Sequence, residues 1–203
     1  MVNEYVWRWF TMVTVGFIVE GDTEKVLIES DNFKNWLKQQ NITIYGNVLD
    51  AKGGGNLLPK NIIPLVNQLK NADYIVILTD LEKDPNKQAV IDRIGTQHTQ
   101  LIFIAVRAVE AWFLADSEAL KNWLSVEVTE IYPEKTINMP WDRLKELANQ
   151  CQQRGTGSSK PAFAKRMTKH WGFSLKRAAF HPNCPSAKEF YDGLLKLAAS
   201  STQ

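Results

Sequence analysis

The sequence predicts an α/β fold, in which a central, mostly parallel sheet is flanked by helices and carries a helical C-terminal cap. Three observations support this prediction. Short apolar, β-branched runs recur along the first half of the chain, which is typical of strands buried on both faces. Segments of helical periodicity separate these runs and are long enough to connect parallel strands. Beyond about residue 130 only helical patterns and turns follow.

Each predicted strand is an apolar run that ends in polar residues or a loop. The run at 74–78 (YIVIL) is the clearest, because Thr79 and Asp80 follow it directly. The run at 11–19 ends in the same way at Glu20 and Gly21. Strands are expected at 11–19, 42–48, 74–78 and 101–106.

Helical spacing of apolar residues fills the intervals between these strands. Asp22 or Thr23 is expected to cap the first helix, and Pro64 is expected to start or kink a turn in the second. The predicted organisation is an α/β domain over residues 1–130, with a helical, basic extension over residues 131–203 packed on it. Helices are expected at about 22–37, 57–70, 85–94, 109–124, 141–152, 161–171 and 187–199.

The bulk composition is that of an ordinary globular protein. Of the 203 residues, 44% are hydrophobic and 23% are charged, and there are two cysteines, so a disulfide framework is excluded and a reducing compartment is expected. The segment 2–19 is rich in apolar residues, but Asn3, Glu4 and Arg8 interrupt it. It is too polar for a membrane span, which needs about eighteen or more apolar residues. We therefore expect a cytoplasmic protein without a membrane span.

Positive charge is concentrated near the C-terminus. The formal net charge of +2 is too small to indicate a nucleic-acid-binding protein by itself. From Gln153 onward, however, basic residues far outnumber acidic ones, which favours a surface that faces a polyanion; the alternative is a solvated helix face. The basic residues of this part are Arg154, Lys160, Lys165, Arg166, Lys169, Lys176, Arg177, Lys188 and Lys196.

Acidic residues follow three of the four predicted strands. Glu20 follows the first strand, Asp80 and Glu82 follow the third, and Glu110 lies just beyond the fourth. Ligands of open parallel sheets bind at the carboxyl ends of the strands, so these carboxylates are expected to meet at one edge, with Glu24 one helical turn past Glu20. Such a cluster repels itself unless a cation neutralises it. Oxygen ligands without His or Cys favour Mg²⁺ or Mn²⁺, and each acid on its own has the simpler interpretation of a helix cap.

A glycine loop follows the second predicted strand. Gly53, Gly54 and Gly55 come after Lys52 and before a predicted helix, so their backbone amides can approach a phosphate. The segment is not a P-loop, because no Gly-Lys-Ser/Thr follows it. A flexible turn is the alternative interpretation.

Three of these segments together resemble the Toprim family. The segment 17–24 (FIVEGDTE) is similar to the Toprim motif of a strand followed by Glu-Gly-x-Thr-Glu, and 77–84 (ILTDLEKD) is similar to the Asp-x-Asp motif. The segment 106–116 (VRAVEAWFLAD) resembles a stretch of the Toprim-like DUF4276 group, which is related to the OLD (overcoming lysogenization defect) nucleases. The chain departs from Asp-x-Asp at Glu82, and Asp84 is an alternative third acid. The resemblance covers residues 13–124.

The resemblance implies a Toprim-like (Rossmann-like) fold and Mg²⁺- or Mn²⁺-dependent phosphodiester chemistry. It implies that Glu20 is a metal ligand or general base and that a lysine, Lys160 or Lys165, joins the site. The implied metal ligands are Glu20, Glu24, Asp80, Glu82, Asp84 and Glu110. Nucleic acid, with DNA favoured, is expected to contact Lys52, Arg107, Arg154, Lys165, Arg166 and Lys169.

The function expected from these features is that of a DNA nuclease of a bacterial defence system. The resemblance also implies an ATPase partner protein, since the chain has no ATP-binding motif of its own, and a homodimer is a further expectation. Two alternatives stay open. One is a non-catalytic subunit that binds such a partner, and the other is phosphotransfer on a small phosphate substrate.

Overall fold

The computed structural model describes residues 12–97 and 101–200. Thr11, the predicted first residue of the first strand, lies outside the described residues, as does the apolar-rich segment that precedes it. Among the described residues, no helix combines the length and the apolar character that a membrane span requires.

The described strands form one sheet in which every pairing is parallel, as the sequence predicts. The strand order is β2-β1-β4-β5, and β3 pairs with β1 beyond the end of β2. The strand expected at 42–48 is shortened to 42–44, because the chain makes a turn at Gly46, where φ is +62°, and β3 begins only at Leu49. The strands are β1 (Val13–Val19), β2 (Ile42–Ile44), β3 (Leu49–Asp50), β4 (Tyr74–Asp80) and β5 (Leu101–Ala105).

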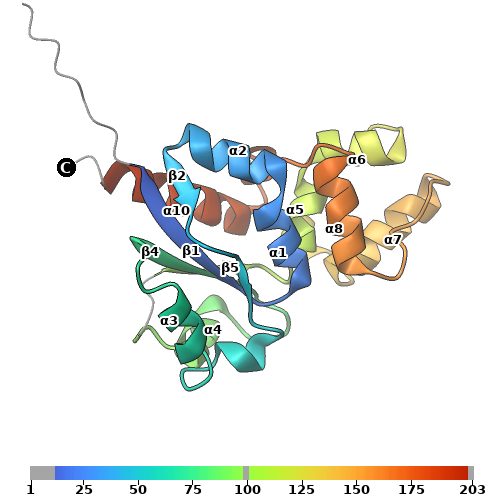
Figure 1. The fold of residues 1–203 in the computed structure, drawn as a ribbon. Helices are drawn as coiled ribbons and strands as arrows, with labels where there is room; N and C mark the ends of the chain where they lie inside the picture. Colours follow the sequence, from blue (N-terminus) through green and yellow to red (C-terminus); the bar gives the residue numbers. More distant parts are fainter. Residues whose placement is uncertain (1–11, 98–100, 201–203) are drawn as a thin grey trace, which may run out of the picture.

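Helices cover both faces of this sheet (Figure 1). Alternating residues of each strand point to opposite faces, so Phe17 joins the larger hydrophobic cluster and Ile18 joins the smaller one. The helices of the described residues are α1 (Asp22–Glu29), α2 (Asp31–Gln39), η1 (Gly54–Leu57), α3 (Ile63–Gln68), α4 (Lys87–Ile94), α5 (Glu110–Ala115), α6 (Ser117–Leu124), η2 (Pro133–Lys135), α7 (Pro140–Gln150), α8 (Lys160–Lys169), α9 (Leu175–Ala179) and α10 (Pro185–Ser200).

Two predicted helices are each divided by a capping side chain. The helix expected at 22–37 breaks at Ser30, whose hydroxyl accepts a hydrogen bond from the amide of Phe33 and begins α2. The helix expected at 109–124 breaks at Asp116, which caps α6 through the amide of Ala119. The prediction that Asp22 or Thr23 caps α1 is wrong, because Gly21 holds that position.

Two further predictions change. The helix expected at 57–70 is reduced to α3, with Pro64 in its first turn, and η1 forms earlier, in the glycine loop. The sequence patterns do not predict α9, a helix of five residues capped by Ser174.

The C-terminal helices pack on the sheet and extend its larger hydrophobic cluster. Phe190 of α10 stacks on Phe33 and Trp112, with ring centroids 6.1 and 5.4 Å apart. Gly193 allows α10 to approach β5, because a Cβ atom there would stand 2.3 Å from the Phe103 ring. The cluster runs from Val13 in β1 to Leu197 in α10, so the first described strand and the last described helix share one core.

Candidate active site at the carboxyl ends of the strands

The pairing of β1 with β4 places Glu20 beside Asp80. Val19 lies opposite Leu78 in the parallel register, and the amide of Glu20 donates to the carbonyl of Leu78 at 3.0 Å. The Glu20 carboxylate accepts a hydrogen bond from the Thr79 hydroxyl and another from the Asp80 amide at 3.3 Å. The carboxylate is therefore held across the ends of the two central strands.

Glu24 points back to the same edge from the first turn of α1. Its Oε2 atom accepts a hydrogen bond from the amide of Gly21, the N-cap residue, at 3.0 Å. Only 5% of the residue is exposed. Burial, together with the charges of Glu110 and Glu20, raises the pKa of Glu24 to about 7, although hydrogen bonds from backbone amides oppose the rise.

Asp80 and Glu110 complete the group of carboxylates. Asp80 ends β4, and its Oδ1 atom accepts a hydrogen bond from the amide of Val109 at 2.9 Å. Burial raises the pKa of Asp80 well above its usual range, and the charges of Glu24, Glu110 and Glu20 raise it further. Glu110 begins α5 and is only 2% exposed. The charges of Glu20 and Glu110 therefore favour the protonated forms of Glu24 and Asp80.

Lys160, the first residue of α8, reaches this group from the C-terminal extension. Its ammonium group lies 3.1 Å from Oε1 of Glu110. Burial lowers the pKa of Lys160, but the charges of Glu110, Asp80 and Glu24 outweigh this effect and raise it above its usual value. The lysine is therefore a permanent cation beside the acids at neutral pH.

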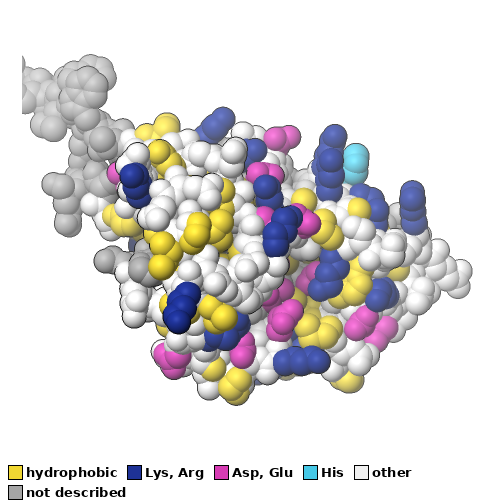
Figure 2. All heavy atoms as spheres, turned by 60° about the horizontal axis from the view of Figure 1, so that its bottom comes forward, with side chains coloured by type: hydrophobic (Ala, Val, Ile, Leu, Met, Phe, Trp, Pro, Cys, Tyr) yellow, Lys and Arg dark blue, Asp and Glu magenta, His cyan; other side chains and the backbone are white. Residues whose placement is uncertain are grey.

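These residues surround an open pocket of about 410 Å³, which we call the acidic pocket. Figure 2 shows Asp and Glu side chains gathered near the middle of one face of the molecule, with Lys and Arg side chains on several sides of them. Four of the predicted metal ligands line the pocket, and Glu110 contacts its lysine. The lining residues are Glu20, Gly21, Asp22, Thr23, Glu24, Asp50, Lys52, Gly53, Asp80, Glu82 and Lys160.

The donor set fits a hard divalent cation. Oε2 of Glu110 is buried and has no hydrogen-bond partner in the described part of the chain, which leaves a carboxylate oxygen free to accept a cation or a proton. No three Asp, Glu, His or Cys side chains among the described residues already surround a single ion position. Mg²⁺ usually keeps several waters and takes only one or two carboxylates directly, so the pocket needs no complete protein cage.

The remaining predicted ligands differ in their surroundings. Glu82 is exposed, lines the acidic pocket and adopts a positive φ of 47°. Asp84 is absent from the residues that line the pocket, and its Oδ2 atom lies 3.0 Å from Nη2 of Arg93. The position of Asp84 suits a structural ion pair, while Glu82 faces the pocket.

The basic residues predicted to contact nucleic acid are distributed unevenly. Lys52 lines the acidic pocket, where its ammonium group lies 2.6 Å from Asp50 and 3.0 Å from Asp22. These contacts hold the pKa of Asp22 below its usual value. The Arg107 side chain is engaged elsewhere, because its guanidinium donates to the carbonyl of Thr136. Of these two residues, only Lys52 faces the pocket.

The other basic residues lie on or near α8. Lys165 and Lys169 are exposed and line a separate hollow between α1 and α8, together with Glu29 and Asp31. Lys160, and not Lys165, is the lysine that joins the carboxylates. Arg154 is exposed.

The Arg166 side chain contacts other parts of the protein instead of the pocket. Its Nη2 atom donates to the carbonyl of Thr156 at 2.6 Å, and its guanidinium lies over the rings of Phe163 and Trp171. The side chain therefore joins the last turn of α8 to the segment that precedes the helix.

Three residues in or beside the pocket are not identified by the sequence reasoning. Asp50 ends β3 shortly before the glycine loop, so the rule that locates Glu20 and Asp80 also applies to it. The sequence marks Asp22 only as a possible helix cap. It marks Thr79 only as the end of a strand, although its hydroxyl binds Glu20; no sequence signal distinguishes that contact.

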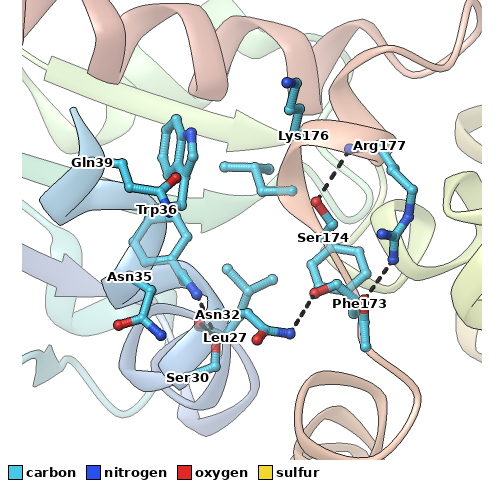
Figure 3. A pocket seen from close by; sticks show the side chains of 13 residues that line it. Leu27, Ser30, Asn32, Asn35, Trp36, Gln39, Phe173, Ser174, Lys176 and Arg177 are labelled. Atoms are coloured by element: carbon cyan, nitrogen blue, oxygen red, sulfur yellow. Dashed lines mark hydrogen bonds between the residues drawn. The ribbon is translucent and has the colours of Figure 1, made fainter.

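A second pocket, also of about 410 Å³, lies between α2 and the segment 172–177 (Figure 3). No acidic residue lines it. Its polar groups serve the fold: the Asn32 side-chain amide donates to the carbonyls of Thr168 and Phe173, both at 3.3 Å, and Arg177 donates to the carbonyl of Gly172 at 2.5 Å. The acidic pocket is therefore the better candidate for chemistry.

Comparison with known proteins gives a family and two structural likenesses. The family described as "Domain of unknown function (DUF4276)" matches residues 19–195. No curated protein gives a significant match. The C-terminal region of the Xanthomonas campestris pv. campestris OLD protein is similar, with 18% identity, 95% coverage of this chain, 98% coverage of that one and a TM-score of 0.40. The C-terminal region of the Burkholderia pseudomallei OLD protein is also similar, with 15% identity, 89% coverage of this chain, 98% coverage of that one and a TM-score of 0.41.

Proposed function

The chain belongs to the DUF4276 family, and because that family has no described function, we propose one from the acidic pocket: metal-dependent hydrolysis of phosphodiester bonds in nucleic acid, with DNA as the first candidate. The metal is Mg²⁺ or Mn²⁺. The Toprim-like motifs at 17–24 and 77–84 support this proposal, since they supply Glu20, Glu24 and Asp80.

One observation carries the proposal. In the buried Glu110 carboxylate, Oε1 lies 3.1 Å from the Lys160 ammonium, and Oε2 has no hydrogen-bond partner in the described part of the chain. The charges of Glu110, Glu20 and Glu24 also repel the charge of Asp80. A buried, unsatisfied carboxylate oxygen costs about 1–3 kcal/mol or more. A fold that needed these acids only as caps would gain nothing from placing them together, whereas a cation compensates the repulsion of all of them.

Different residues of the pocket would bind the cation, accept a proton and stabilise negative charge. One or two of the carboxylates of Glu20, Glu24, Asp80, Glu82 and Glu110 would bind the cation directly, and the others would bind its waters. A bound Mg²⁺ or Mn²⁺ lowers the pKa of an attacking water and neutralises charge on the phosphate. Glu20, fixed by Thr79 and the Asp80 amide, would be either one of these ligands or the base that takes the proton of a water whose oxygen attacks phosphorus. The bond from phosphorus to the leaving oxygen then breaks, and the Lys160 ammonium stabilises the developing negative charge.

The surroundings of the pocket suit a polyanionic substrate. Lys160 and Lys52 line it, and Lys and Arg side chains lie on several sides of the acids in Figure 2. Cations at the rim neutralise the backbone phosphates and make binding dependent on salt. We retain the role in bacterial defence, the ATPase partner and the homodimer as parts of this proposal, on the basis of the motif resemblance alone.

Plasmid cleavage tests the proposal. The purified protein is incubated with supercoiled DNA and Mg²⁺ or Mn²⁺, and wild type is compared with Glu20→Ala, Asp80→Ala and Glu110→Gln. We expect each substitution to lower the rate by a factor of at least about 100, the usual effect of removing a general acid or base. The matched control is Glu127→Gln, because the Glu127 side chain is 82% exposed and pairs only with Lys121 in the described structure.

Three results would count against the proposal. Cleavage that survives both Glu20→Ala and Asp80→Ala would show that the acidic pocket is not the catalytic centre. A wild type that binds Mn²⁺ by calorimetry without cleaving DNA or RNA would favour the small-phosphate or the partner-binding alternative. A wild type that neither binds metal nor cleaves would overturn the proposal.

A further inference from the structure

Arg93 approaches the acidic pocket from behind the glycine loop 53–55. It lies in the last turn of α4, and its side chain is 34% exposed. Nη2 lies 3.0 Å from Oδ2 of Asp84, and Nη1 donates to the carbonyl of Gly54 at 3.4 Å. One guanidinium therefore joins the loop after β4 to the glycine loop after β3.

Gly54 is the point at which Arg93 and Glu20 converge. A Cβ atom at residue 54 would stand 3.1 Å from Oε1 of Glu20 and 3.2 Å from Nη1 of Arg93. The loop is also attached to the backbone of Glu20, because the amide of Gly53 donates to the Glu20 carbonyl at 2.8 Å. Because Gly54 has no side chain, the Glu20 carboxylate and the Arg93 guanidinium can both lie close to its Cα atom.

The two oxygens of the Glu20 carboxylate have different surroundings. Oε2 accepts from Thr79 and from the Asp80 amide, and Oε1 is the atom that faces Gly54. Nη1 of Arg93 also faces Gly54, so the two charged groups lie close to the space that a side chain at residue 54 would take. Oε2 of Glu20 is thus held by hydrogen bonds, while the glycine loop limits the space around Oε1.

We propose that Arg93 is a positioning residue for Glu20, anchored by Asp84, which holds the glycine loop against the Glu20 carboxylate and fixes the direction in which that carboxylate faces the pocket. The consequence for activity rests on the proposed function, whereas the effect on Glu20 does not. This role also gives Asp84 a function without making it a metal ligand. The competing interpretation is an ordinary partly exposed ion pair, which would contribute about 1 kcal/mol or less to stability and nothing to the pocket.

The Asp80 amide is a direct reporter of the Glu20 position, because it donates to Oε2 of Glu20. In ¹H–¹⁵N spectra of the metal-free protein, Arg93→Gln and Gly54→Ala should both shift the Asp80 resonance. Gly55→Ala is the matched control, since a Cβ atom at residue 55 would meet nothing within 4 Å. The amide of Val109, which bonds to Asp80 instead, is an internal reference that should move less.

Mn²⁺ affinity provides the second measurement. Residues that orient metal ligands usually contribute 10–100-fold to affinity, so Arg93→Gln and Gly54→Ala should each weaken Mn²⁺ binding by about tenfold, and Gly55→Ala should not. Arg93→Lys should recover part of the loss, because it restores the charge but not the fork that reaches both Asp84 and Gly54.

The outcomes separate this inference from the proposed function. If Arg93→Gln leaves both the Asp80 resonance and Mn²⁺ affinity unchanged, Arg93 is an ordinary ion-pair residue and the inference is wrong, even if the protein cleaves DNA. If the wild type neither binds Mn²⁺ nor cleaves, the proposed function fails, yet a shifted Asp80 resonance in Arg93→Gln and Gly54→Ala still establishes the positioning of Glu20.

Discussion

Glu24 occupies a place where a carboxylate is costly to ionise. It is almost fully buried in the first turn of α1, and Glu110 and Glu20 are close enough to repel its charge. The folded protein therefore binds a proton at Glu24 more tightly than the unfolded chain does, because the unfolded glutamate has its ordinary pKa of 4.5 and the folded one has a pKa of about 7.

This difference predicts that the metal-free protein loses stability as the pH rises. Below the ordinary pKa both states hold the proton, and the favourable contribution of Glu24 is fully present. Between pH 4.5 and about 7 only the folded state keeps it, so stability falls, and the loss is complete above that range. The loss is on the order of 3 kcal/mol. The raised pKa of Asp80 acts in the same direction. Thermal melts of the metal-free protein from pH 5 to pH 8 measure this loss of stability.

Glu24→Gln should flatten this pH profile, whereas Glu29→Gln, at the exposed end of the same helix, should not. Addition of Mg²⁺ or Mn²⁺ at pH 8 should raise the melting temperature of wild type, because a ligand of the folded state alone stabilises it by mass action. A profile that rises toward pH 8 in metal-free wild type would contradict the unfavourable ionisation of Glu24.

At the scale of the elements, the junction of α5 and α6 shows how the C-terminal extension is fastened to the α/β part of the chain. Asp116 is completely buried there. Its carboxylate caps α6 through the amide of Ala119 at 3.2 Å and accepts the amide of Ser174 at 2.8 Å. It also accepts two hydrogen bonds from Arg177, at 2.7 and 2.9 Å. One side chain thus connects α6 to α9.

Asp116→Ala should therefore destabilise the fold by about 3 kcal/mol, the cost of breaking a buried, hydrogen-bonded ion pair. Urea unfolding followed by circular dichroism measures the change. Glu127→Ala is the control, because its pair with Lys121 is on the surface and should contribute less than about 1 kcal/mol. A similar loss in both variants would show that Asp116 adds nothing beyond a surface contact.

At the scale of the whole molecule, acids and bases are arranged around one edge of the sheet. The carboxylates lie at the carboxyl ends of β1, β3 and β4, and α8 brings Lys160 to them while Lys165 and Lys169 remain exposed. If the proposed function holds, a long polyanion bound at the acidic pocket would pass close to α8, and we expect the exposed lysines of this helix to contact further phosphates.

The double variant Lys165→Ala/Lys169→Ala should weaken DNA binding for all sequences alike. It should also reduce the slope of log K against log salt by about 0.9 for each phosphate that the protein no longer neutralises. Fluorescence anisotropy with a labelled duplex, without divalent metal and at several salt concentrations, measures both effects. Lys70→Ala is the control, because Lys70 is exposed near the start of β4, at the opposite end of the sheet. An equal loss of affinity in the control would indicate that charge alone, and not position on α8, governs binding.

The sequence alone determined the α/β fold and the gathering of acids at one edge. Apolar runs such as 74–78 form strands wherever the two faces of a sheet are covered, and parallel strands bring their carboxyl ends together. Glu20 and Asp80 could therefore be placed side by side without coordinates. The breaks at Ser30 and Asp116 could not be predicted in this way, because a local cap and a continuing helix have similar apolar spacing.

Only the tertiary structure decided which side chains meet. Lys160 and Lys165 face different directions from the same basic helix, and the packing of α8 against α1 is what turns Lys160 toward Glu110 and leaves Lys165 outside. The pairing of Asp84 with Arg93 and the seating of Gly54 between Arg93 and Glu20 depend equally on packing. Periodicity fixes the face and the edge on which a residue lies, whereas contacts between distant segments depend on how whole elements pack.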